Sequence, residues 1–245
     1  MAALSISELT TYRWSFEEDI ARFRDAGFRA VGVWRQKLAE YGEEKGVELL
    51  AESGLAVSNL LWCGGFTGSD GRSFREGIDD AREALHLAAA MKAGVLIVHS
   101  GARGGHTHNH ARRMLRDALL ELLPTAQEVG VVLAVEPMHP EAAGGCTFLN
   151  DLGDALGLVE GIGDSHVKIA YDTYHLGLVP DWREQLAAAA RHIAVVHVGD
   201  GLPPVDREQV RTRLGEGRVP LAEMLAALQA TGFEGYYDIE LVGLS

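Results

Sequence analysis

The sequence predicts one (β/α)8 barrel over residues 1–245. Eight short apolar segments alternate with helix-like segments, which is typical of parallel strands joined by right-handed crossovers. A length of 245 residues suits eight such units. Four of the apolar segments also end in a residue type that binds metals, and a barrel brings those ends together at one mouth. An open doubly wound sheet is the alternative, but the first strand–helix turn has no glycine-rich dinucleotide loop.

The first half of the chain predicts four strand–helix pairs. Its strands are expected at Leu4–Thr10, Phe28–Trp34, Leu55–Trp62 and Gly94–Val98. Capping boxes from Ser15 and Ser73 predict helices that end near residues 27 and 91, and a further helix is expected over 43–53. Arg35 and Lys37 are expected in the loop after the second strand.

The second half repeats the alternation. Its strands are expected at Gly130–Val135, His166–Asp172, Ile193–His197 and Tyr236–Glu240. A helix over residues 110–128 should kink or break at Pro124, and Asn150 should cap a helix that runs through residue 158. Further helices should start near residues 181–184 and at Pro220, with a long loop over 199–217 between them. No eighth helix is expected after the last strand.

Four strand ends carry the residues that can bind a metal. They are Glu136, Asp172, His197 and Glu240. One such residue alone is more often a helix cap or a packed polar group, but four in successive strand units indicate a shared site. A buried charge needs a partner, and three carboxylates with one imidazole suit one divalent cation, Mn²⁺ foremost, with Mg²⁺, Co²⁺ and Zn²⁺ as alternatives.

A cation held in this way polarises a carbonyl and favours an enediolate. Glu136 and Glu240 come from strands separated by two others, so they can face each other across the mouth. Two such carboxylates can remove and return a proton.

Here the chain resembles the sugar phosphate isomerase/epimerase family of xylose isomerase-like TIM barrels. The motifs that carry the resemblance are Glu136-Pro137 with His139, Asp172-Thr173-Tyr174-His175, His197-Val198-Gly199-Asp200, Arg211–Gly217 and Asp238-Ile239-Glu240. The resemblance implies one divalent metal on the four strand-end residues, the two glutamates as the acid/base pair, and substrate oxygens held by His175 and Arg211. It also implies isomerisation, epimerisation or dehydration through an enediolate.

Other residues near the mouth are candidates for the substrate pocket. Trp34 and Trp62 end strands and could pack on a sugar, but core packing is an equal alternative. His99 and His139 are further candidates. A histidine cluster over residues 106–110 is expected in a solvated loop or lid. Inside the barrel, Lys168 and Asp238 share the inward phase of the ligands, so we expect them to meet each other or a shared polar network.

Composition limits the class of partner. A formal net charge of −13 disfavours nucleic acid and anionic membranes, and no apolar run reaches the ~20 residues of a membrane span. Two cysteines, Cys63 and Cys146, with no signal peptide indicate a cytoplasmic protein. The expected substrate is a small sugar or keto-polyol, which we expect to be unphosphorylated.

Three rival functions remain open at this stage. They are an apurinic-site endonuclease-like metal hydrolase, a catalytically silent sugar-binding barrel, and a dehydratase or lyase on a keto-inositol or 3-keto sugar. Lastly, the outward side chains of the last strand, Tyr237, Ile239 and Leu241, are apolar. We expect a second subunit of a homo-oligomer, or the flanking helices, to cover them.

Overall fold

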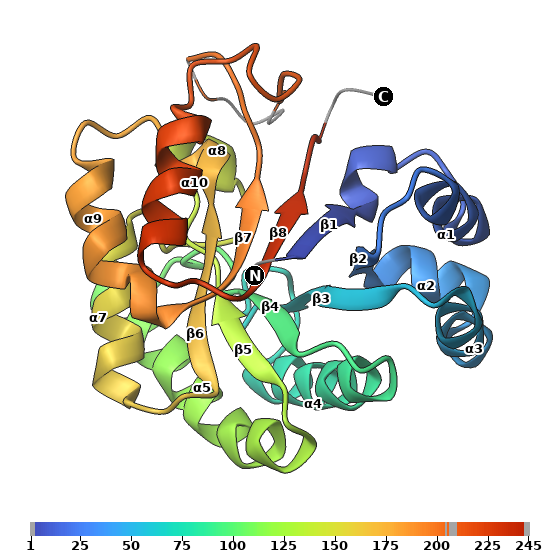
Figure 1. Cartoon of the computed structure of the whole chain (residues 1–245). Helices are drawn as coiled ribbons and strands as arrows, with labels where there is room; N and C mark the ends of the chain where they lie inside the picture. Colours follow the sequence, from blue (N-terminus) through green and yellow to red (C-terminus); the bar gives the residue numbers. More distant parts are fainter. Residues whose placement is uncertain (1–2, 204, 206–209, 243–245) are drawn as a thin grey trace.

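Eight parallel strands form a closed barrel in which each strand neighbours the next along the chain and β8 closes on β1 (Figure 1). The computed structural model describes residues 3–203, 205 and 210–242. The predicted fold class is confirmed. The strands are β1 (Ala3–Ser7), β2 (Ala30–Trp34), β3 (Ala56–Gly64), β4 (Val95–His99), β5 (Val132–Val135), β6 (Val167–Asp172), β7 (Ile193–Val198) and β8 (Tyr236–Ile239).

Helices form an outer layer around this barrel (Figure 1). They are η1 (Glu8–Thr11), α1 (Phe16–Asp25), α2 (Arg35–Tyr41), α3 (Glu43–Ser53), α4 (Phe74–Ala90), α5 (His108–Val129), α6 (Pro140–Ala143), α7 (Leu152–Ile162), α8 (Thr173–Leu176), α9 (Trp182–Ala189), η2 (Ala190–His192) and α10 (Leu221–Ala230). Within the described part of the chain, no helix follows β8.

Local capping chemistry explains most helix starts. The Ser73 hydroxyl accepts a hydrogen bond from the amide of Glu76, and the Glu76 carboxylate accepts one from the amide of Ser73, so the predicted capping box is present. One predicted break and one predicted cap were wrong. Pro124 does not break α5, because the buried apolar face of that helix outweighs one lost N–H, and a kink at this residue stays a prediction. The cap of α7 is Asp151, while Asn150 donates to the Met138 carbonyl at 3.2 Å.

The core has two apolar layers, as expected for a barrel inside a ring of helices. A large cluster fills the space between the strands and the helices. A smaller cluster fills the barrel interior, made by Leu61, Val95, Ile97, Ala134, Ala170 and Val195. The polar mouth above this plug therefore rests on packed apolar side chains.

A buried ionic cluster fixes the elements beside the mouth. Lys37 lies in the first turn of α2 rather than in a loop, and its ammonium donates to the carboxylate of Asp19 and, at 2.8 Å, to the Thr11 carbonyl. Glu8 Oε2 accepts from the Trp34 amide at 2.7 Å. Burial raises the pKa of Glu8 well above its usual range. This cluster ties η1, α1 and α2 together, which makes Lys37 a packing residue.

The outer face of β8 is only partly covered. Tyr237 packs into the outer cluster and is 9 % exposed, whereas Ile239 and Leu241 are half-buried. On the neighbouring strand, Leu4 is 55 % exposed. In Figure 1, β8 and β1 lie between α10 and α1 with no helix over them. The outward phase of Tyr237 is confirmed, and cover by a second subunit stays a prediction.

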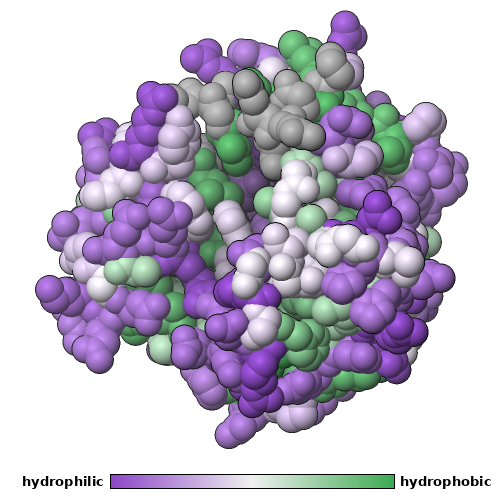
Figure 2. Space-filling view, turned by 180° about the vertical axis from the view of Figure 1, so that it is seen from behind, coloured by the Kyte–Doolittle hydropathy of each residue, from purple (hydrophilic) through white to green (hydrophobic). Residues whose placement is uncertain are grey.

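The surface is dominated by hydrophilic residues. The face opposite to that of Figure 1 shows hydrophobic residues mainly in its hollows (Figure 2). Among the described helices, none is both long enough and apolar enough to cross a membrane.

Candidate metal centre and substrate cavity

Four strands deliver the predicted ligands to the C-terminal mouth. Glu136 directly follows β5, Asp172 ends β6, His197 lies in β7 and Glu240 directly follows β8. None of the four is more than 5 % exposed. Parallel pairing places Asp172 opposite His197, so adjacent strands bring these two side chains together.

Three of the four residues have the spacing of a metal site. Glu136, Asp172 and His197 each offer a ligand atom, and these atoms lie within 4.8 Å of one another. His197 Nε2 is buried without a hydrogen-bond partner among the described residues. Glu240 is also close, with Oε2 at 3.7 Å from His197 Nδ1. Buried carboxylates that gather around one imidazole nitrogen, His197 Nδ1, form a donor set that fits a divalent cation.

Arg211 balances the negative charge at this mouth. Its guanidinium is 1 % exposed and lies 2.8 Å from Asp172 Oδ2 and 3.0 Å from Glu240 Oε1. It also donates to the Glu240 carbonyl at 3.1 Å and stacks over the ring of Tyr174. A Cβ at residue 199 would lie 2.4 Å from this guanidinium, so Gly199 is needed for the arginine to enter.

The two glutamates have different electrostatic surroundings. Burial disfavours the charge of Glu136, but the charge of His197 and hydrogen bonds from His197 and His99 hold its pKa well below the usual range. Burial raises the pKa of Glu240 to about 7, against the lowering effect of Arg211 and His197. One carboxylate is therefore held ionised while the other is close to its titration point, a difference typical of acid/base pairs.

Two further histidines meet the same centre. His99, at the end of β4, bonds through Nε2 to Glu136 Oε2 at 2.7 Å. His175 lies in α8 with both ring nitrogens buried and without a hydrogen bond among the described residues, although Nε2 lies 3.9 Å from Asp172 Oδ2. Burial, reinforced by Arg211, lowers the pKa of His175 to about 4, so its ring is neutral near pH 7. A neutral, unsatisfied imidazole is suited to a ligand hydroxyl or carbonyl.

Asp200 organises the loop that carries Arg211. Its carboxylate accepts from the backbone amides of Gly201, Gly215, Gly217 and Val219, at 2.8–3.1 Å. A Cβ at residue 217 would lie 2.0 Å from Asp200 Oδ1, which explains the glycine there. The motif after β7 thus has a structural role that the sequence did not reveal.

The ligand cluster opens into a cavity of about 260 Å³. Its lining is Leu9, Leu61, Trp62, His99, Glu136, Met138, Cys146, His175, Arg211, Glu240 and Val242. Among the predicted substrate contacts, Trp62, His99, His175 and Arg211 therefore line this cavity, while Trp34 and His139 lie outside its lining. Sequence reasoning missed Met138 and Cys146, because they come from a loop after β5 with no strand-end signal.

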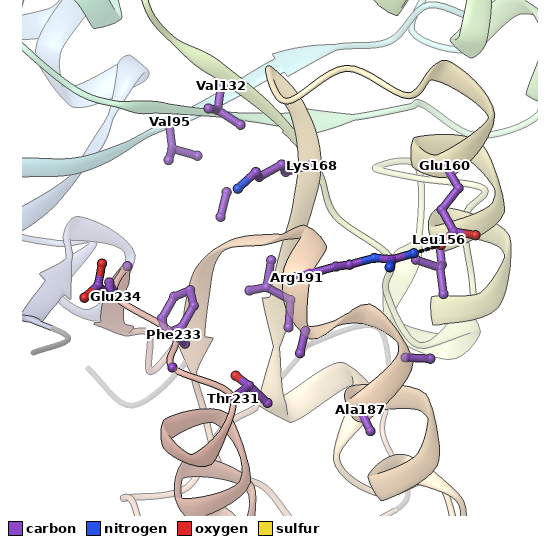
Figure 3. A pocket seen from close by; sticks show the side chains of 16 residues that line it. Val95, Val132, Leu156, Glu160, Lys168, Ala187, Arg191, Thr231, Phe233 and Glu234 are labelled. Carbon is purple, nitrogen blue, oxygen red and sulfur yellow. Dashed lines mark hydrogen bonds and ion pairs between the residues drawn. The ribbon is translucent and has the colours of Figure 1, made fainter.

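A larger cavity, about 980 Å³, lies at the opposite end of the barrel and contains none of the predicted site residues. Lys168 points toward it, whereas Arg191 turns to Glu160, which it meets at 2.9 Å (Figure 3). Asp238 instead accepts from Asn59 at 2.9 Å near the mouth. The expected contact between Lys168 and Asp238 was therefore wrong: the two side chains share a phase but lie at different heights in the barrel.

The predicted histidine cluster is spread over the start of α5. His108 pairs with Asp154 at 3.1 Å, and the rings of His106 and His110 stack 4.8 Å apart. These surface contacts involve none of the four predicted ligands.

Comparison with known families matches residues 20–243 to the xylose isomerase-like TIM barrel. Among curated relatives, fructoselysine 3-epimerase of Escherichia coli O157:H7 is 30% identical over 171 residues, which are 69% of this chain and 60% of that protein. D-psicose 3-epimerase of Enterocloster bolteae is 28% identical over 228 residues, covering 89% of this chain and 70% of the relative. The chain thus spans about 60% of the fructoselysine 3-epimerase that it matches.

A solved structure of protein SMc04130 from Sinorhizobium meliloti 1021 superposes with a TM-score of 0.91 at 30% identity. The superposition covers 99% of this chain and 90% of that structure. The likeness therefore extends over the whole barrel and not over a local motif.

Proposed function

The chain belongs to the xylose isomerase-like TIM-barrel family, and from this premise we propose that it is a divalent-metal-dependent epimerase or isomerase of a small ketose or keto-polyol. One observation carries the proposal: two buried glutamates from β5 and β8 approach the same nitrogen, His197 Nδ1, at 2.8 and 3.7 Å, beside a cavity of about 260 Å³. The names of the relatives, both ketose 3-epimerases, point to the same chemistry.

The cation would be held by Glu136, Asp172, His197 and Glu240. When bound, it would supply positive charge where negative charge develops on the substrate oxygens. Arg211 lies on the Asp172–Glu240 side of this cluster, so the site already tolerates a buried positive charge between carboxylates.

Proton transfer falls to the two glutamates. One carboxylate removes the proton from the carbon beside the carbonyl, and the other returns a proton to the opposite face, which inverts that centre. His99 holds one oxygen of Glu136 and so fixes the direction of its carboxylate. His175 and Arg211 can donate to substrate oxygens within the same cavity.

The test is a screen of ketoses, keto-inositols and 3-keto sugars in D₂O. The protein is stripped with EDTA, reloaded with Mn²⁺, and followed by NMR for deuterium next to the carbonyl. We expect exchange that depends on Mn²⁺ and is lost on renewed EDTA treatment. Absence of exchange with every sugar, or binding of three metal ions per chain with cleavage of abasic DNA, would contradict the proposal and favour the nuclease.

A further inference from the structure

A second cavity of about 370 Å³ adjoins the proposed active site. The two cavities share three residues, Trp62, His99 and Cys146. The rings of Trp62 and His99 stack 4.7 Å apart, and His99 in turn contacts Glu136 at 2.7 Å. The second cavity therefore begins one side chain away from a residue that we place in proton transfer.

Polar side chains and glycines form the rest of its lining. They are Arg35, Cys63, Gly64, Gly65, Ser69, Asp70, Arg72, Asp80, Gly101 and Gly145. With four glycines on the wall, few side chains obstruct the cavity. At about 260 Å³, the first cavity is slightly smaller than the ~300 Å³ at which ordinary ligand pockets begin. A ligand that used both cavities would fit the usual range.

Apart from His99, which pairs with Glu136, the charged part of this lining consists of two arginines and two aspartates. Asp80 holds both guanidiniums, that of Arg35 at 3.0 Å and that of Arg72 at 3.1 Å. Arg72 also pairs with Asp70 at 2.7 Å and donates to the Gly64 carbonyl at 3.0 Å. These contacts hold the four side chains in place, yet each keeps between 22% and 39% of its side-chain surface exposed. They are preorganised and still accessible to a ligand.

The charge balance decides what kind of ligand fits. Two guanidiniums and two carboxylates sum to no net charge, so a phosphate dianion would meet repulsion along with attraction. A neutral or zwitterionic group can instead donate to the aspartates and accept from the arginines. Trp62 adds an aromatic surface where the two cavities join.

We infer that the substrate is a substituted ketose, whose reacting end lies against Glu136 and Glu240 and whose neutral or zwitterionic substituent, a glycosyl group or a nitrogen-linked amino acid, occupies this second cavity. The inference rests on the proposed function and names its substrate class. It assigns Arg35, Arg72, Asp70 and Asp80 to substrate selection.

The test compares four ketoses with the Mn²⁺-loaded protein by deuterium exchange. They are D-fructose, fructose 6-phosphate, isomaltulose with its glycosyl substituent, and fructosyl-lysine with its zwitterionic one. We expect kcat/KM for isomaltulose or fructosyl-lysine to exceed that for D-fructose at least tenfold, and fructose 6-phosphate to gain nothing. Which conjugate is preferred distinguishes a sugar from an amino acid in the second cavity.

Two variants test whether the second cavity produces the preference for substituted ketoses. Arg72→Gln should reduce the ratio of kcat/KM, substituted over free ketose, about tenfold. Arg82→Gln is the matched control. Arg82 lies in α4, its side chain is 29 % exposed, and it pairs with Asp79 and Glu121 outside the lining of the cavity. It should leave the ratio unchanged.

Equal or better use of free D-fructose, or a preference for the phosphate, would overturn the inference while leaving the proposed function standing. Exchange with none of the sugars would instead remove the proposed function itself. If Arg72→Gln had the same ratio of kcat/KM, substituted over free ketose, as the wild type, Arg72 would have no role in substrate selection. The comparison of substrates with the wild-type protein needs no variant, so a poorly folding Arg72→Gln protein does not stop the test.

Discussion

Replacing Arg211 by methionine should destabilise the metal-free protein strongly. The guanidinium is 1 % exposed and makes three contacts of 2.8–3.1 Å with Asp172 and Glu240. Without it, two buried carboxylates lose their positive partner. Breaking a buried ion pair from one side costs about 3–5 kcal/mol. For a chain of this size, about 2–4 °C per kcal/mol converts that cost to a melting temperature about 6–20 °C lower.

The assay is calorimetric unfolding in EDTA and again with excess Mn²⁺. We expect the loss to be largest in EDTA and smaller with Mn²⁺, because the cation supplies the missing positive charge to the same carboxylates. Ligand at 100 times its Kd adds about 2.7 kcal/mol to the free energy of unfolding.

The matched control is Arg183→Met. Arg183 pairs with Glu223 on the surface, and both side chains are 57 % exposed. Its replacement should change the free energy of unfolding by less than about 0.5 kcal/mol. If Arg211→Met melted within a degree or two of Arg183→Met in EDTA, Arg211 would not be the charge partner that this reasoning requires. If Mn²⁺ left the gap between them unchanged, the cation would not share its carboxylates.

Three further predictions concern the surroundings of the site. Because burial raises the pKa of Glu8, its contribution to stability is present below its ordinary pKa of ~4.5 and is lost as pH rises. The free energy of unfolding of Glu8→Gln, measured in urea at pH 5 and pH 8, should therefore fall less between these two pH values than that of the wild type. An equal fall in both proteins would contradict this. Lys37→Met leaves a buried carboxylate unpaired and should cost about 3–5 kcal/mol in thermal unfolding, so a loss below ~1 kcal/mol would refute the buried pair. Gly217→Ala places a Cβ 2.0 Å from the Asp200 carboxylate and should lower kcat/KM at least tenfold. Gly161→Ala, with no atom within 4 Å of its Cβ, should leave kcat/KM unchanged. Equal activity of the two variants would show that the loop does not need its glycine.

The sequence was sufficient to predict the barrel and the strand ends at which the four candidate ligands lie, because both depend on local signals. A short apolar run that ends in a charged residue identifies the end of a strand, as with Glu136 after β5. Parallel pairing then requires neighbouring strand ends to meet at one mouth. The alternation of inward and outward side chains does not, however, tell how far along the barrel axis an inward side chain lies. Lys168 and Asp238 share the inward phase, yet Lys168 lines the cavity at the far end of the barrel, whereas Asp238 is level with His197 and accepts from Asn59.

Features that depend on long-range packing could not be predicted. Lys37 follows a strand and resembles a loop residue, but its partner Asp19 is brought in by a separate helix. The pairing of Asp80 with Arg35 and Arg72 likewise joins residues from α4, α2 and the loop after β3. No periodicity signals such contacts, so the second cavity becomes visible only in the folded chain.

The central claim is that Glu136 and Glu240 move a proton beside a bound cation. The most direct measurement is deuterium incorporation next to the carbonyl of the best ketose by wild type, Glu136→Gln and Glu240→Gln, with Mn²⁺ occupancy measured in each sample. We predict one Mn²⁺ per wild-type chain, and in each variant a loss of exchange of at least 100-fold per occupied site, since glutamine keeps the shape of the side chain but cannot act as a base. Near-normal exchange in either variant with the metal still bound would contradict the claim.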